Sequence, residues 1–153
     1  MANTFLQIFI HVVFAVKNRG SLINPQWIPH VHRYIAGVIN ARGHQVIAVG
    51  GTQNHVHLLF SLSSKEAVSD LIREVKISTH RYIESKRAAL YDFSWQTGYA
   101  CISVSPSNVE SVKRYIQHQM EHHNGVTMRQ EIASMLDRAG VEYDELYLFE
   151  DAE

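Results

Sequence analysis

Residues 4–17 constrain the fold more than any other stretch of this 153-residue chain. Successive residues of a strand point to opposite faces of a sheet, and here apolar side chains alternate on both faces. One face would carry Leu6, Ile8, Ile10, Val12, Phe14 and Val16, and the other Phe5, Gln7, Phe9, His11 and Val13. A strand that is largely apolar on both faces is typical of the centre of a sheet. We therefore expect a sheet with this strand in its middle.

The rest of the chain predicts the other elements of that sheet. Turn residues and apolar periodicity predict a helix over 25–41, strands over 44–50 and 54–60, a helix from 64, a strand over 95–105, a helix after Pro106 that ends at 124–125, and a last helix over 128–139. The order β-α-β-β-α-β is that of the ferredoxin-like split β-α-β plan. We expect an α+β fold, with an antiparallel sheet, two helices on one face and additional C-terminal helices.

Two local signals refine these elements. The turn at 50–53 joins two strands into an expected hairpin. Ser107 with Glu110 three residues later has the pattern of a capping box, which would start the helix after Pro106.

The composition limits the classes of protein to which this chain can belong. Hydrophobic residues make up 46% and charged residues 19%, as in ordinary globular proteins, and the length suits one domain. No apolar run approaches membrane-spanning length, and the first residues lack the basic start of an export signal. Cys101 is the only cysteine, so no internal disulfide forms. We expect a cytoplasmic protein that does not contact membranes.

The net charge of −1 conceals an uneven distribution. Residues 141–153 hold six of the fifteen acidic residues and none of the fourteen basic ones, so residues 1–140 carry a net +5. A mildly basic body permits nucleic-acid binding without requiring it. We expect a single domain over 1–140 and an acidic C-terminal tail over 141–153, which could equally be a solvated terminus.

The histidines of Asn54-His55-Val56-His57-Leu58-Leu59-Phe60 are the first candidates for chemistry. His55 and His57 point to the same face of a strand, where two imidazoles can share one divalent metal, while Val56 and its alternating neighbours anchor the other face in the core. The spacing also arises by accident, and no carboxylate or cysteine lies beside it in the sequence. Two half-exposed histidines, one of them hydrogen-bonded, remain an alternative.

Polar and basic residues on two predicted helices complete the candidate set. Tyr115 and Gln119 lie at i and i+4, on one helix face, although a tyrosine there is often only a residue at the edge of the core. A basic stripe on the earlier helix includes Arg73 and Lys76. Lys113 and Arg114, immediately before Tyr115, would place positive charge where a phosphate must dock.

Together these motifs resemble a known family, the single-tyrosine HUH transposases. This family comprises the small transposases of certain insertion sequences and the REP-associated tyrosine transposases. The resemblance runs from about residue 7 to residue 123, in matching order and spacing. It rests on the segments 11–17, 50–51, 55–59, 103–107 and 112–119.

The resemblance implies a role for each residue. His55 and His57 match the metal ligands of the family, Gln119 its third ligand, and Tyr115 its nucleophile. It implies cleavage and rejoining of single-stranded DNA, with hairpin-containing ends, through a phosphotyrosine intermediate. It also implies a divalent metal, for which magnesium or manganese suits the function, and a homodimer in which the tyrosine helix can serve the partner's histidines.

Two other classes of function stay open at this stage. One is a non-catalytic module of the same fold that binds single-stranded nucleic acid, with bases stacked on sheet aromatics such as Phe9. The other is a metal-dependent hydrolase that activates water, in which Tyr115 is merely structural. Only a tyrosine nucleophile forms a covalent adduct with DNA, which separates the transposase from both alternatives.

Overall fold

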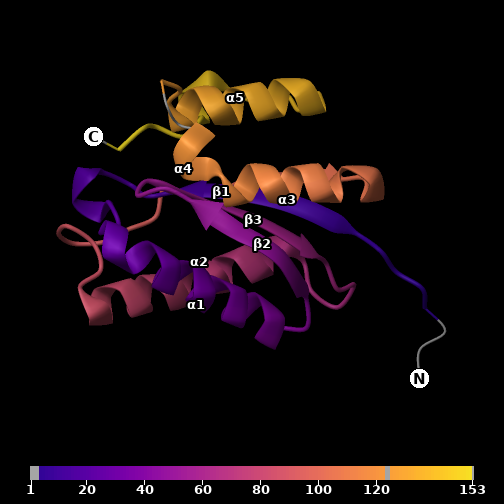
Figure 1. Ribbon diagram of the computed structural model, residues 1–153, viewed down its shortest axis with the longest axis horizontal. Coiled ribbons are helices and arrows are strands. Elements are labelled where there is room, and N and C mark those ends of the chain that lie inside the picture. Colours follow the sequence, from indigo (N-terminus) through magenta and orange to yellow (C-terminus); the bar gives the residue numbers. More distant parts are fainter. Residues whose placement is uncertain (1–3, 123–124, 153) are drawn as a thin grey trace.

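A four-stranded antiparallel sheet forms the centre of the protein, with strands in the order β2-β3-β1-β4 (Figure 1). The computed structural model describes residues 4–122 and 125–152. The strands are β1 (Phe9–Ala15), β2 (Gln45–Gly51), β3 (His55–Ser61) and β4 (Ala100–Val104). Helix α1 (Ile28–Ala41) connects β1 to β2, and α2 (Val68–Lys86) connects β3 to β4. This arrangement confirms the expected ferredoxin-like split β-α-β fold and its hairpin.

The central strand is shorter than the alternating pattern predicts. Phe9 pairs with Ser61 of β3 on one side and with Val104 of β4 on the other, and both partner strands end there. Residues 4–8 therefore have no ladder to join, and the Phe5 side chain is 98% exposed. The last strand is shorter too, since Trp95 makes only an isolated bridge with Val16.

One face of the sheet is covered by α1 and α2, as the sequence predicts. Val56, Leu58 and Phe60 of β3 are fully buried there beside β1. The helices contribute a set of buried aliphatic side chains: Val31, Ile35 and Ile39 from α1, and Leu71, Ile72, Val75 and Ile83 from α2. This packing fixes β3, so the side chains between these three residues must point to the opposite face.

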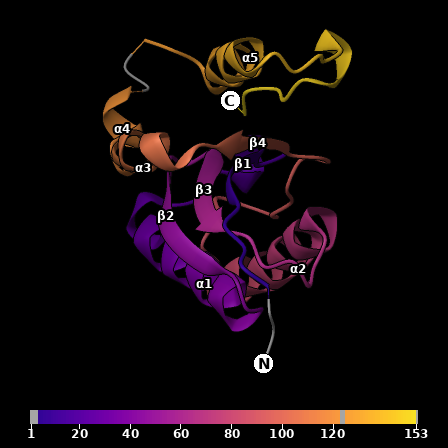
Figure 2. The ribbon, with the colours of Figure 1, turned by 90° about the vertical axis from the view of Figure 1, so that its right-hand side faces the viewer.

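The opposite face carries the C-terminal helices (Figure 2). These are α3 (Val109–Gln117), α4 (Gln119–His122) and α5 (Met128–Ala139). Short 3₁₀ turns complete the described elements: η1 (Arg19–Ser21), η2 (Pro25–Trp27), η3 (Pro106–Asn108) and η4 (Glu145–Tyr147). The sheet thus lies between two layers of helices, and the second layer carries Tyr115.

The helix with Tyr115 differs from its prediction at both ends. Ser107 lies inside η3, and the N-cap of α3 is Asn108 without a side-chain hydrogen bond, so the expected capping box with Glu110 is absent. The helix stops at Gln117 because His118 leaves helical geometry (φ −112°, ψ 27°), and α4 restarts at Gln119. The stop expected at 124–125 falls partly outside the described residues.

The acidic segment after α5 packs against the protein as far as residue 152. Phe149 is buried with Met128 beside the sheet. The Asp151 carboxylate accepts hydrogen bonds from the first backbone amides of α5, at 3.0 Å from Met128 N. The Arg129 guanidinium donates to the carbonyls of residues 145, 148 and 149. The segment therefore holds the start of α5, which also carries a capping box of Thr127 and Gln130.

Helix α3 crosses β2 at a glycine. A Cβ atom on Gly50 would lie 2.1 Å from the backbone oxygen of Ile116, the residue after Tyr115. A backbone atom cannot move aside as a flexible side chain can, so only glycine permits this approach. The position of Tyr115 over the sheet thus depends on Gly50.

In the part of the chain that the structure describes, no helix combines the length and the apolar character needed to cross a membrane.

We predict that Gly50→Ala lowers the free energy of unfolding by about 1–3 kcal/mol, because it overpacks the contact between α3 and β2. Gly37→Ala is the matched control. Nothing lies within 4 Å of a Cβ there, in the middle of α1, so that change should raise stability by about 0.5–1 kcal/mol. Urea unfolding of both variants measures the difference. Equal stabilities would show that the close approach does not constrain α3.

Candidate metal and tyrosine site

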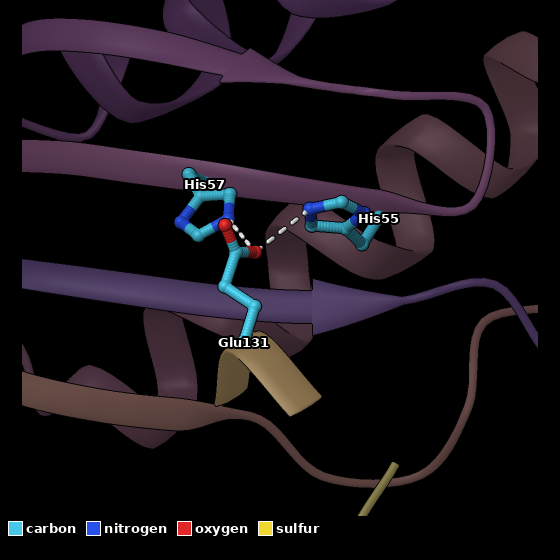
Figure 3. A group of neighbouring side chains, drawn as sticks. All are labelled: His55, His57 and Glu131. Carbon is cyan, nitrogen blue, oxygen red and sulfur yellow. Dashed lines mark hydrogen bonds and ion pairs between the residues drawn. The ribbon is translucent and has the colours of Figure 1, made fainter. Parts of the chain in front are cut away.

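His55 and His57 lie fully buried on the face of β3 that meets the C-terminal helices. Their Nε2 atoms point at one atom, Oε1 of Glu131, at 3.3 Å and 2.9 Å respectively (Figure 3). The predicted arrangement of two imidazoles on one strand face is present. The reading in which both are half-exposed strand histidines is wrong, because α5 covers them.

Glu131 is the residue that sequence reasoning missed. It comes from α5, which was expected as a helix but not as part of a site, and it is 7% exposed. A weak signal exists in the sequence, since Glu131 falls in the apolar stripe formed by Met128, Ile132 and Met135. A carboxylate on the buried face of a helix requires partners that satisfy its charge.

The other ring nitrogen of each histidine is held by a neighbour. His55 Nδ1 lies 2.7 Å from Asn54 Oδ1 and 3.1 Å from Thr52 Oγ1. His57 Nδ1 lies 2.8 Å from Nε2 of His11, on β1. Such contacts orient an imidazole and select the tautomer that presents Nε2 to a shared ligand point. Burial, followed by the charge of His57, lowers the pKa of His11 to about 3, so His11 is neutral and its Nε2 can accept a hydrogen bond from the Nδ1–H of His57.

Gln119 belongs to this group, as the sequence predicts. Its side chain is 1% exposed, with Oε1 3.0 Å from His55 Nε2. Its Nε2 donates to Glu131 Oε2 at 3.2 Å. The break at His118 does not remove Gln119 from the site, because it remains about one helical turn beyond Tyr115.

The Tyr115 hydroxyl donates a hydrogen bond to Glu131 Oε2, and its ring packs edge-on against His57. Burial, followed by this contact with Glu131, raises the pKa of Tyr115 well above its usual range. The phenol is therefore neutral at physiological pH, and it meets the histidines of its own chain.

The four basic residues predicted to contact DNA do not gather at this site. Arg73 and Lys76 lie on α2, across the sheet from Tyr115. The Lys76 ammonium donates to the carbonyls of Gln96 and Gly98, at 2.9 Å and 2.5 Å, and burial lowers its pKa to about 8. Their contact with DNA stays a prediction, for a surface away from the tyrosine.

Lys113 and Arg114 share α3 with Tyr115 but project elsewhere. At 3.6 residues per turn, Lys113 points about 200° and Arg114 about 100° around the helix from Tyr115. The cation near the hydroxyl is instead Arg138 of α5, whose charge opposes the rise in the tyrosine pKa. Arg138 and Tyr115 line the same cavity. The positive charge expected beside the tyrosine is present, but a different helix supplies it.

The group has the donor set of a divalent metal site. One atom each from His55, His57 and Glu131 lies within 4.8 Å of the others, and Gln119 Oε1 adjoins them. Two imidazole nitrogens with carboxylate and amide oxygens suit manganese and other transition metals, and oxygen ligands also suit magnesium. The residues present fit the divalent metal that the resemblance implies.

Comparison with known proteins agrees with the resemblance. The family described as "Transposase IS200 like" matches residues 4–119. The ISDra2 transposase TnpA of Deinococcus radiodurans is 23% identical over 118 residues, which are 74% of this chain and 84% of that protein.

Two solved structures share the fold. A putative transposase from Deinococcus radiodurans R1 has a TM-score of 0.60 at 17% identity, over 78% of this chain and 95% of that one. A REP-associated tyrosine transposase bound to a REP hairpin has a TM-score of 0.60 at 16% identity, over 100% of this chain and 96% of that one. The resemblance inferred from the sequence motifs is confirmed: the chain belongs to the IS200-like transposase family.

Proposed function

We propose that this protein cuts and rejoins single-stranded DNA through a covalent bond between Tyr115 and a DNA phosphate, with the help of a divalent metal. One observation carries the proposal. The tyrosine hydroxyl, the two histidines and Gln119 all meet the carboxylate of Glu131 within one chain. A tyrosine that is only structural has no need of a buried carboxylate at its hydroxyl that also faces a histidine pair.

The metal would be held by Nε2 of His55 and His57, Oε1 of Glu131 and Oε1 of Gln119. Magnesium or manganese is the proposed ion. When bound, it supplies charge withdrawal from the scissile phosphate, which makes the phosphorus more open to attack.

The two carboxylate oxygens of Glu131 have different partners and different proposed roles. Oε1 faces the histidines, and Oε2 accepts the hydrogen bond of the Tyr115 hydroxyl. Because the phenol is neutral, its proton must leave as the bond to phosphorus forms, and Glu131 Oε2 is in place to accept it.

The proposed exchange then balances without a nucleotide cofactor. The Tyr115 oxygen bonds to phosphorus, the bond from phosphorus to the 3′ oxygen breaks, and the proton passes to that oxygen. A free 3′ hydroxyl can reverse the step on a new partner strand. The proposed substrate is single-stranded DNA with hairpin-containing ends, of the kind suggested by the REP hairpin held by the solved neighbour.

We predict that Tyr115→Phe abolishes the covalent adduct with a single-stranded oligonucleotide and leaves the fold and DNA binding nearly intact. The change removes one oxygen and keeps the ring beside His57. Denaturing electrophoresis of protein mixed with labelled DNA and manganese detects the adduct. Persistence of the adduct in the phenylalanine variant would exclude Tyr115 as the nucleophile. Cleavage by the unaltered protein without any adduct would favour the water-activating hydrolase.

We predict that His55→Ala, His57→Ala and Glu131→Gln each weaken manganese binding by at least about tenfold, since each removes or neutralises a proposed ligand. Calorimetric titration measures the affinity. The control is His80→Ala, a part-exposed histidine on α2 across the sheet, which should bind manganese as the unaltered protein does. If all three site variants keep the original affinity, these residues do not form a shared metal site.

We infer that Tyr115 acts on the metal group of its own chain. The support is its hydrogen bond to Glu131 and its ring contact with His57 of the same chain. The homodimer implied by the resemblance stays a prediction, and light scattering tests it.

Mixing His57→Ala protein with Tyr115→Phe protein tests the inference. Each variant should be inactive alone, and the mixture should stay inactive, because every chain lacks one half of its own site. Recovered cleavage in the mixture would mean that a tyrosine from one chain works with the histidines of another.

A further inference from the structure

A cavity of about 410 Å³ opens directly beside Tyr115. It is bounded by β4 and the residue that follows it, by α3 and by α5. His11, the partner of His57, contributes to its lining. The cavity is therefore continuous with the histidine and tyrosine group, although no step proposed above uses it.

The lining combines apolar walls with hydroxyl groups. Val104, Val112 and Met135 contribute apolar surface from three different elements, and Ser103 and Ser111 contribute hydroxyls. The volume falls in the range of pockets that bind small molecules, about 300–1,000 Å³. A nucleobase has matching properties, with flat apolar faces and hydrogen-bonding groups confined to its edge.

Arg138 provides positive charge at this cavity. It follows Glu131 by seven residues and Met135 by three, so all three lie on one side of α5. Its guanidinium comes near enough to Tyr115 to affect the phenol electrostatically. An arginine beside a nucleophile and a base-sized cavity has the chemistry of a phosphate contact.

We propose that this cavity holds the nucleoside adjoining the scissile phosphate, and that Arg138 contacts the DNA backbone there. The proposal rests on the proposed function, since it assigns a substrate group to a place beside the nucleophile. Its consequence is that the protein itself selects a base at the cut. Hydroxyls beside apolar walls discriminate among base edges, because an edge with the wrong pattern of donors and acceptors cannot form the same hydrogen bonds.

A substitution that fills the cavity tests the proposal. Ser111 lies one turn before Tyr115 on the cavity side of α3, so Ser111→Trp should occupy the space. Ser85→Trp is the control, at an exposed position on α2 across the sheet. The probe is a DNA hairpin with a single-stranded flank of randomised sequence, incubated with manganese. The covalently captured strands are then sequenced.

The unaltered protein and Ser85→Trp should enrich one base at a position that adjoins the tyrosine-linked phosphate. Ser111→Trp should form fewer adducts, because the indole ring occupies the place of the nucleoside, and the adducts that remain should lose that enrichment. Adducts without enrichment in the unaltered protein, or the same enrichment in Ser111→Trp, would overturn the proposal. No adduct from the unaltered protein on any flank would instead contradict the proposed function itself.

Arg138 gives a second test that does not depend on how Ser111→Trp folds. Arg138→Gln should weaken binding of the same hairpin probe about tenfold and reduce the salt dependence by about one charge, whereas Arg138→Lys should retain most of the affinity. Manganese affinity should stay unchanged in both, because Arg138 is not among the ligand atoms. If the glutamine variant binds DNA as tightly as the unaltered protein does, Arg138 does not contact the DNA backbone and that part of the proposal is overturned.

Discussion

The buried carboxylate of Glu131 is the point on which the site depends. It connects β3, through His55 and His57, with two consecutive helices that come much later in the sequence: α3 through Tyr115 and α4 through Gln119. A carboxylate in this environment is unfavourable without hydrogen bonds or opposite charge. The same contacts that satisfy it also join the tyrosine hydroxyl and the histidine pair to one carboxylate, so the electrostatic requirement and the proposed catalytic geometry coincide.

Two features outside the group of polar side chains maintain this arrangement. Gly50 lets α3 approach β2 closely enough for Tyr115 to reach the sheet face that carries the histidines. Asp151 and Phe149 fix the start of α5, the helix of Glu131, from the acidic end of the chain. Helices α3 and α5 are thus each positioned by a contact outside the polar group, so the side chains of the candidate site do not have to position these two helices alone.

Local patterns were enough to predict the sheet, its order of elements and the shared face of His55 and His57, because strand alternation determines which side chains lie together. That these histidines and Gln119 bind a metal was implied by the family resemblance and stays a proposal. Glu131 could not be found in that way. Its contribution depends on how α5 packs over the sheet, and no periodic pattern in the local sequence predicts that packing. Arg138 was missed for the same reason, and Lys113 was preferred because it neighbours Tyr115 in sequence. On a helix, however, adjacent residues point in different directions.

The matched family region and the helix that follows it contribute different parts of the candidate site. Residues 4–119 match the family and contain the histidine pair, Tyr115 and Gln119. Glu131, Arg138 and one wall of the cavity beside Tyr115 come from α5, beyond that region. In this chain the shared region therefore provides the proposed nucleophile and most of the proposed ligand set. The helix that follows provides the proposed proton acceptor and closes the space where we place the base at the cut. If the cavity holds that base as proposed, changes on the cavity side of α5 should alter base selection while the histidine pair and Tyr115 stay as they are.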